Sequence, residues 1–166
     1  MLNHWKCMNL NVTGSICDVS DHVEREKLMD KVKTIFNGKL DILVNNAGTT
    51  GPAWKPATQF TSEEYSSLMA TNFDSAFHLS QLAHPLLKAS GKGSVVYISS
   101  IAGTGALSEG IAVYCSTKGA MNQLTKALAC EWAGDMIRVN SVAPGIITTP
   151  MTKPILSPLF SSAAPP

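Results

Sequence analysis

Apolar and polar stretches alternate along the chain in a way that predicts a repeating order of strands and helices. Leu10 to Val19 has the pattern of a strand, and Ser20 follows as a plausible N-cap for a helix that runs to about Phe36. Leu40 to Val44 is a short, almost wholly apolar run between turn residues. Such a run is typical of a parallel strand that helices cover on both faces.

The second half of the chain continues this order. Thr61 begins the sequence T-S-E-E, a capping box with Glu64 at its third helical position, and the apolar period after it predicts one long helix to about Ala89. Three further elements follow: a strand at Val95 to Ser99, a helix at Ala112 to Ala133 and a strand at Ile137 to Val142.

Each connection between these strands is long enough for a right-handed crossover between parallel strands. The sequence therefore predicts an α/β fold with a doubly wound, Rossmann-like parallel sheet. Ligands bind beyond the carboxyl ends of such strands, so the residues after Val19, Val44, Ile98 and Val142 should share one cleft. We expect one core domain over residues 1–151 and a disordered tail, rich in Pro and Ser, over residues 152–166.

Composition excludes several classes of partner. The formal net charge is +1 and charged residues make up 15% of the chain, which gives no excess for binding nucleic acid. Apolar runs fall far short of the roughly 20 residues that a membrane helix needs.

No apolar leader precedes Asn9, and four scattered cysteines indicate reduced thiols packed in the interior of a soluble, cytoplasmic protein. These are Cys7, Cys17, Cys115 and Cys130.

Residues whose side chains could take part in catalysis follow two successive strands and begin the next helix. Asn45-Asn46-Ala47-Gly48 follows one strand, Ser99-Ser100 follows the next, and Tyr114 and Lys118 lie near the start of the helix after it. Tyr114 and Lys118 are four residues apart and share one helical face. Because a nearby ammonium stabilises a phenolate, this pair could exchange a proton with a substrate. A serine hydroxyl could hold the substrate oxygen. Each motif alone is a common pattern, but their joint occurrence indicates a site that protonates a carbonyl while hydride arrives from a nicotinamide.

These motifs carry a resemblance to a known family. N-N-A-G, the S-S before Y-x-x-x-K, and P-G-I-I-T after the last strand are similar to the serial motifs of the short-chain dehydrogenase/reductase family, over about Leu10 to Met151. The stretches Tyr114 to Trp132 and Ile137 to Asn140 resemble the tropinone reductase-like branch. The resemblance implies an enzyme that reduces a small ketone, or oxidises the secondary alcohol, with NADP(H).

The resemblance also implies roles for individual residues. Tyr114 would be the general acid/base, Lys118 would bind the nicotinamide ribose, and Asn72 would hold a water in a proton relay. Ser100 would bind the carbonyl oxygen, but its spacing from Tyr114 exceeds the family's by one residue, which leaves Ser99 open as the alternative. No metal is implied. Cofactor contacts would come from Tyr114 and Lys118 together with Asp18, Val19, Asn45, Ala47, Gly48, Pro144, Gly145, Ile147 and Thr149.

The sequence departs from the family pattern at both ends. Family members begin with a strand, a glycine-rich turn and a helix, and residues 1–40 hold no such turn. The expected sheet is therefore incomplete, without the family's first two strands and its last. In the family, the glycine-rich turn and the N-terminus of the helix after it bind the pyrophosphate of the cofactor. We therefore expect no activity from this chain alone. The family's sheet order also leaves the strand at Leu10 to Val19 without its usual neighbours.

Two functional hypotheses follow from the sequence. The chain belongs to an active oxidoreductase, or it is a truncated, non-catalytic fragment that binds a related full-length subunit. The two long helices match the surface through which the family usually dimerises, so the resemblance also implies a homo-oligomer. A different nucleotide-binding α/β domain, such as a methyltransferase, would leave Tyr114 and Lys118 unexplained.

Overall fold

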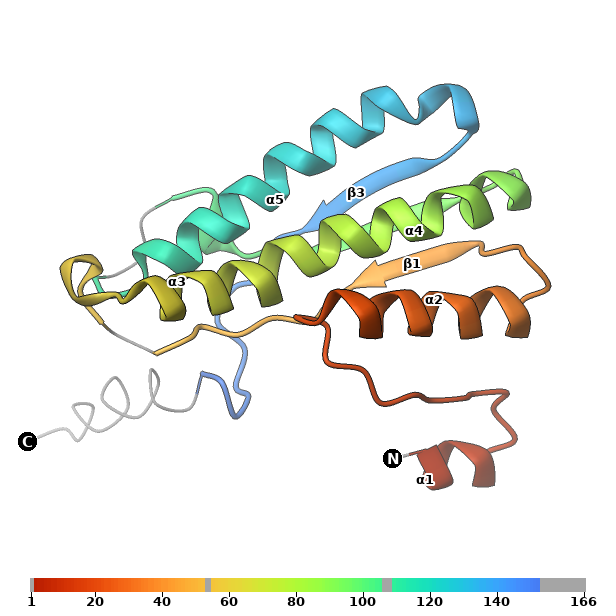
Figure 1. Cartoon of the computed structure of the whole chain (residues 1–166), viewed down its shortest axis with the longest axis horizontal. Helices are drawn as coiled ribbons and strands as arrows, with labels where there is room; N and C mark the ends of the chain where they lie inside the picture. The colour runs from red at the N-terminus through yellow and green to blue at the C-terminus, as the bar shows by residue number, and fades with distance from the viewer. Residues whose placement is uncertain (1, 53–54, 106–108, 153–166) are drawn as a thin grey trace, which may run out of the picture.

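A three-stranded parallel sheet forms the centre of the molecule. The computed structural model describes residues 2–52, 55–105 and 109–152. Strands β1 (Ile42–Asn45), β2 (Ser94–Ile98) and β3 (Arg138–Val142) lie in the order β1-β2-β3 (Figure 1). Three of the four predicted strands are thereby confirmed, with ends within two residues of those expected.

The helices connect these strands and cover one side of them. They are α1 (Leu2–Cys7), α2 (His22–Ile35), α3 (Ser62–Met69), α4 (Ser75–Ser90) and α5 (Ala112–Glu131), with 3-10 turns η1 (Ala57–Gln59), η3 (Ile101–Gly103) and η4 (Ala133–Asp135). A π turn, η2 (Ala70–Asp74), joins α3 to α4. The single long helix predicted from Thr61 is therefore continuous, but it widens at its middle.

The caps of the helices follow the local hydrogen-bonding chemistry. At α3 the predicted capping box is present: Thr61 Oγ1 accepts from the Glu64 amide at 3.2 Å, and Glu64 Oε2 accepts from the Thr61 amide at 2.9 Å. At α2 the predicted cap is wrong by one residue. Asp21 Oδ1 accepts from the Glu24 amide at 2.9 Å, whereas the Ser20 hydroxyl donates to Asp18 within the preceding turn.

The strand predicted at Leu10 to Val19 is absent from the structure. This segment runs alongside α2 rather than along β1 (Figure 1), and its Ile16 side chain is fully exposed. Its local amide bonds are turn-like, as from Leu10 to the Trp5 carbonyl at 3.1 Å. A strand needs a neighbour for its backbone donors and acceptors, and no described strand lies next to this segment.

One face of the sheet carries the core. Leu43, Val95 and Val139 pair in register across the three strands, and they pack beneath α4 and α5. On the opposite face Ile42 is 60% and Val44 is 54% exposed. Within the described ranges, helices therefore cover only one face of β1, not both as predicted. The result is an incomplete doubly wound α/β fold.

Some predictions concern features away from the sheet. None of the helices in the described part of the chain is long and apolar enough to cross a membrane. All four cysteines are unpaired, but Cys7 and Cys130 are exposed, so the expectation that they pack in the interior is wrong for these two. The predicted tail lies, apart from Thr152, outside the described residues.

Two imidazoles lie at the contact between α2 and α4. The rings of His22 and His78 stack with their centroids 3.8 Å apart, and Arg25 Nε donates to His78 Nδ1 at 3.0 Å. Partial burial, followed by the charges of His22 and Arg25, lowers the pKa of His78 below its ordinary value. The folded state thus resists protonation of this residue.

This arrangement predicts a pH dependence of stability. Since the unfolded chain binds a proton at His78 more readily than the folded chain, the free energy of unfolding should fall as pH drops below about 6.5, the ordinary histidine value. Urea unfolding between pH about 7.5 and about 5 measures this slope, above the range in which carboxylates titrate. His78→Gln should flatten it and His4→Gln should not. An unchanged slope in His78→Gln would contradict the assignment.

Candidate active site

The carboxyl ends of all three strands open onto one cavity of about 600 Å³. Most of the site residues expected from the sequence line it: Ala47, Gly48, Ser100, Tyr114, Lys118, Pro144, Gly145, Ile147 and Thr149. Ser99, the alternative serine, lines it too, and so do residues for which the sequence predicted no role: Asn46, Ile98, Pro150, Met151 and Thr152. Their place directly beside the motifs at the strand ends was the only signal that could have found them.

Lys118 is a buried cation. Its side chain is 4% exposed, and its Nζ donates to the carbonyl oxygen of Ile98, the last residue of β2, at 2.7 Å. Among the described residues no carboxylate forms an ion pair with it. Burial without a counter-ion lowers the pKa of Lys118 below its usual range.

Tyr114 lies one helical turn before Lys118 on α5. The Lys118 Nζ atom is 5.8 Å from the centroid of the Tyr114 ring. Both side chains line the cavity, as their spacing of four residues predicts. The site thus places a phenol and an ammonium on one wall.

The two serines after β2 have different surroundings. Ser99 is buried, and its hydroxyl donates to the Lys118 carbonyl at 3.2 Å. The Ser100 hydroxyl accepts from the Ala102 amide at 3.1 Å as the N-cap of η3, and it is less buried. Accepting that bond leaves the proton of the Ser100 hydroxyl available, so Ser100 is the better placed of the two to donate to a ligand.

Asn72 is fully buried inside the π turn. Its Nδ2 donates to the Thr49 carbonyl at 2.8 Å and to Thr117 Oγ1 at 3.2 Å, while its Oδ1 accepts from the Thr49 amide at 2.8 Å. Both amide protons are therefore used by the protein. Inserted π turns are frequent at functional sites. The sequence did not indicate this turn.

Gly48, in the loop after β1, lies close to both Asn72 and Lys118, although Asn72 itself does not line the cavity. A Cβ atom on Gly48 would lie 3.5 Å from both Asn72 Oδ1 and Lys118 Nζ. The backbone after β1 thus touches the amide of one predicted residue and the ammonium of the other. This contact joins the π turn to α5 at the floor of the site.

The structure does not bring Asp18, Val19 and Asn45 into this cavity. Val19 and Asn45 line a smaller hollow of about 240 Å³ between α2 and β1. Asn45 is buried there, with its Nδ2 donating to Ser80 Oγ at 3.1 Å. Asp18 accepts hydrogen bonds from the Ser20 hydroxyl and amide, which lower the pKa of its carboxyl.

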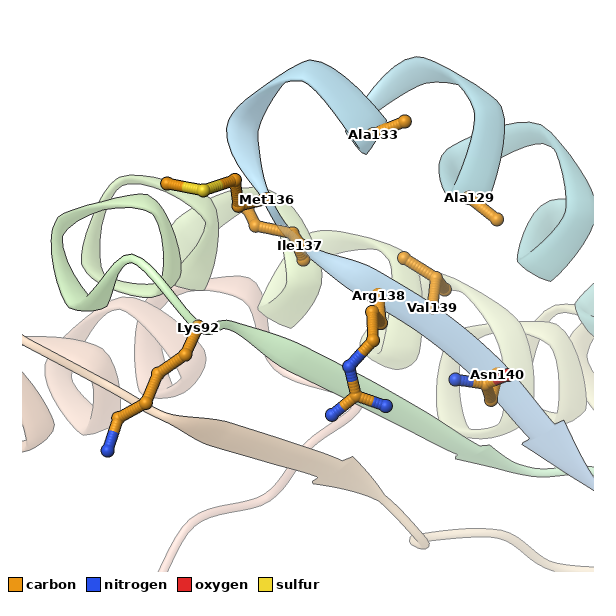
Figure 2. A pocket seen from close by; sticks show the side chains of 8 residues that line it. All are labelled: Lys92, Ala129, Ala133, Met136, Ile137, Arg138, Val139 and Asn140. Carbon is orange, nitrogen blue, oxygen red and sulfur yellow. The ribbon is translucent and has the colours of Figure 1, made fainter.

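A larger cavity of about 690 Å³ lies at the opposite, amino ends of β2 and β3 (Figure 2). Apolar side chains from α5 and β3 line it together with Lys92 and Arg138. Lys92 pairs with Asp41 at 3.1 Å. None of the predicted catalytic residues lines this cavity, so it has no part in the site described above.

The sequence of the chain matches a known protein family along most of its length. The family model described as short chain dehydrogenase matches residues 3–159. The chain belongs to the short-chain dehydrogenase family. A tropinone reductase homolog of Arabidopsis thaliana is 59% identical over 94% of this chain and 57% of its own length. The resemblance to the tropinone reductase-like branch of the short-chain dehydrogenases is thereby confirmed.

Solved structures of short-chain dehydrogenases share the fold. A gluconate 5-dehydrogenase from Burkholderia cenocepacia, in complex with NADP and tartrate, is 28% identical with a TM-score of 0.84, over 93% of this chain and 59% of that one. A 7α-hydroxysteroid dehydrogenase complexed with NADH and 7-oxo glycochenodeoxycholic acid is 31% identical with a TM-score of 0.82, over 99% and 60%. The chain therefore spans less than two thirds of the length of these relatives.

The burial of Asn72 makes its contribution to stability measurable. Asn72→Ala should lower the free energy of unfolding by about 1–3 kcal/mol, because the Thr49 amide and carbonyl lose their partner. Urea unfolding followed by circular dichroism tests this. Gln81→Ala, at an exposed position of α4, is the control and should change little. Equal stability of the Asn72→Ala and parent chains would show that these bonds do not hold the site together.

Proposed function

We propose that this chain carries the active site of an NADP(H)-dependent oxidoreductase that interconverts a ketone and a secondary alcohol. The observation that carries the proposal is the pair on α5. Lys118 is buried, lacks a carboxylate partner in the described structure and lies beside the Tyr114 ring, at the cavity where three parallel strands end. Such strand ends are where α/β sheets bind their ligands.

The cavity fits a nicotinamide cofactor in its chemistry. Lys118 would hold the ribose hydroxyls with the N–H groups that Ile98 leaves free, since an ammonium has three donors. Pro144, Gly145, Ile147 and Thr149 would contact the nicotinamide, and Ala47 and Gly48 would lie beside the adenosine ribose. When bound, the cofactor supplies or accepts a hydride.

The residues of this chain handle the proton. Ser100 would donate a hydrogen bond to the carbonyl oxygen of the ketone and hold it against Tyr114. As hydride reaches the carbonyl carbon, the Tyr114 phenol would give its proton to that oxygen, which yields the alcohol. The ammonium of Lys118 would stabilise the resulting phenolate. Asn72, which approaches Gly48 as Lys118 does, would serve the relay that returns a proton to Tyr114.

Cofactor preference, assembly and location complete the proposal. NADP(H) is supported by the tropinone reductase-like similarity, and the solved relatives include one structure with NADP and one with NADH. We place the enzyme in the cytoplasm, with residues 1–151 as one domain. Exposed aromatic side chains on α3 and α4, Tyr65 and Phe77, support assembly through these helices into a homo-oligomer or with a related subunit.

The function is tested by removing the proposed proton donor. The chain is joined to the amino-terminal segment of a tropinone reductase homolog that carries the family's first two strands and the glycine-rich turn, and ketone reduction is followed by loss of NADPH absorbance. Tyr114→Phe should abolish turnover and leave cofactor affinity nearly unchanged, because only the phenol hydroxyl is removed. Tyr65→Phe is the matched control and should keep full activity. Substantial turnover by the Tyr114→Phe enzyme would refute the assignment.

The chain of 166 residues by itself should behave differently. Each charge-assisted hydrogen bond to the pyrophosphate contributes about 1.5 to 3 kcal/mol, and no described helix begins at a glycine-rich turn beside the cavity. We therefore expect no saturable binding of NADPH or NADH at submillimolar cofactor in calorimetry, and no turnover. Micromolar binding by the purified chain would show that the cavity walls alone suffice.

A further inference from the structure

The loop after β2 contacts α5 at Lys118, the residue that carries the buried ammonium. The Ile98 carbonyl accepts from Lys118 Nζ at 2.7 Å, and Ser99 Oγ donates to the Lys118 carbonyl at 3.2 Å. Gly103, at the end of η3, then lies against the same stretch of helix. Three residues of one short segment, Ile98, Ser99 and Gly103, thus contact both the side chain and the main chain of Lys118.

The contact at Gly103 leaves no room for a side chain. A Cβ atom there would lie 2.7 Å from the Lys118 carbonyl carbon and 2.8 Å from its carbonyl oxygen. Both are main-chain atoms of α5, which cannot rotate away as a side chain can. Any other residue at this position must therefore push η3 and α5 apart at Lys118.

Asn122, one helical turn after Lys118 on α5, forms a hydrogen bond across the same contact. Its Nδ2 donates to the Gly103 carbonyl at 3.1 Å, and the same nitrogen would lie 2.8 Å from a Cβ on Gly103. The side chain is half-buried between the helix and the loop. It supplies the partner that the carbonyl of a closely packed loop residue needs.

We propose that Gly103 and Asn122 form a clamp that positions Lys118 in the active site. The clamp fixes how deeply α5 sits against the end of β2, and this depth sets where Nζ lies relative to the Ile98 carbonyl and the Tyr114 ring. Gly103 and Asn122 are positioning residues, since they act through Lys118 and do not line the cavity. The inference rests on the proposed function in treating Lys118 as part of the reaction site.

The position of Lys118 can be measured without turnover. The folded 166-residue chain is acetylated briefly with acetic anhydride, and the modification of each lysine is quantified by peptide mass spectrometry. Exposed Lys126 on the same helix is the internal reference, and buried Lys118 should react slowly in the parent chain. Gly103→Ala should raise the Lys118 rate about tenfold, the change that a shift of about 1.4 kcal/mol in a local opening equilibrium produces.

Matched variants separate positioning from general stability. Gly105→Ala adds the same methyl group where nothing lies within 4 Å and should leave the Lys118 rate unchanged. Asn122→Asp removes the donor to Gly103 and should expose Lys118, whereas Gln123→Glu makes the same change of charge at an exposed position and should not. Thr61→Ala removes the hydroxyl that caps α3 by accepting from the Glu64 amide, and it reports what lost stability alone does.

The outcomes decide the proposal in each case. A rise in Lys118 labelling for Gly103→Ala and Asn122→Asp, above that of Thr61→Ala, supports the clamp. If Gly103→Ala fails to fold, Asn122→Asp decides alone. Unchanged Lys118 labelling in the folded variants would overturn the clamp whether or not the enzyme reduces ketones. Absence of Tyr114-dependent turnover would refute the proposed function while leaving the labelling result intact.

Discussion

A buried ammonium that pairs with no carboxylate in the described part of the chain is the constraint on which the rest of this site depends. Burying Lys118 costs free energy, because its charge loses water, and among the described residues the Ile98 carbonyl and the ring of Tyr114 lie near it. Such a group stays in place only if the surrounding backbone is rigid. Here the rigidity comes from the crossover between β2 and β3, because α5 packs on the sheet and on the loop after β2. The same burial favours loss of the lysine proton, so the electrostatic strain is located where proton transfer is proposed.

A second connection ties the middle of the long helix to the start of α5. Thr117, fully buried, accepts from Asn72 Nδ2 through its hydroxyl oxygen and donates to the Tyr114 carbonyl at 2.7 Å. Asn72 reaches this position because the π turn displaces it from a regular helical row. The widened turn therefore has a physical consequence. It lets a fully satisfied amide link the loop after β1 with the helical turn that carries Tyr114, through Thr49 on one side and Thr117 on the other.

Local chemistry decided which parts of the structure the sequence could predict. The capping box at Thr61 and the spacing of Tyr114 and Lys118 depend on neighbours within four residues, and both are present as expected. Leu10 to Val19 has the composition of a strand, but strand formation requires a second strand, which composition cannot supply. Tight packing is equally hidden from the sequence. Gly103 looks like any loop glycine until α5 is seen against it.

The same distinction divides the site itself into two halves. Consecutive segments around β2, α5 and β3 carry Ser100, Tyr114, Lys118 and Pro144. The two strands among them, β2 and β3, pair in register along their whole length. Their placement needs only one crossover and its loops. Asp18 and Val19 belong to a segment without a strand beside it, and they lie away from the cavity. The half proposed to move the proton can therefore be ordered by β2, α5 and β3 alone, whereas the cofactor contacts expected at Asp18 and Val19 lie on a segment that pairs with no described strand.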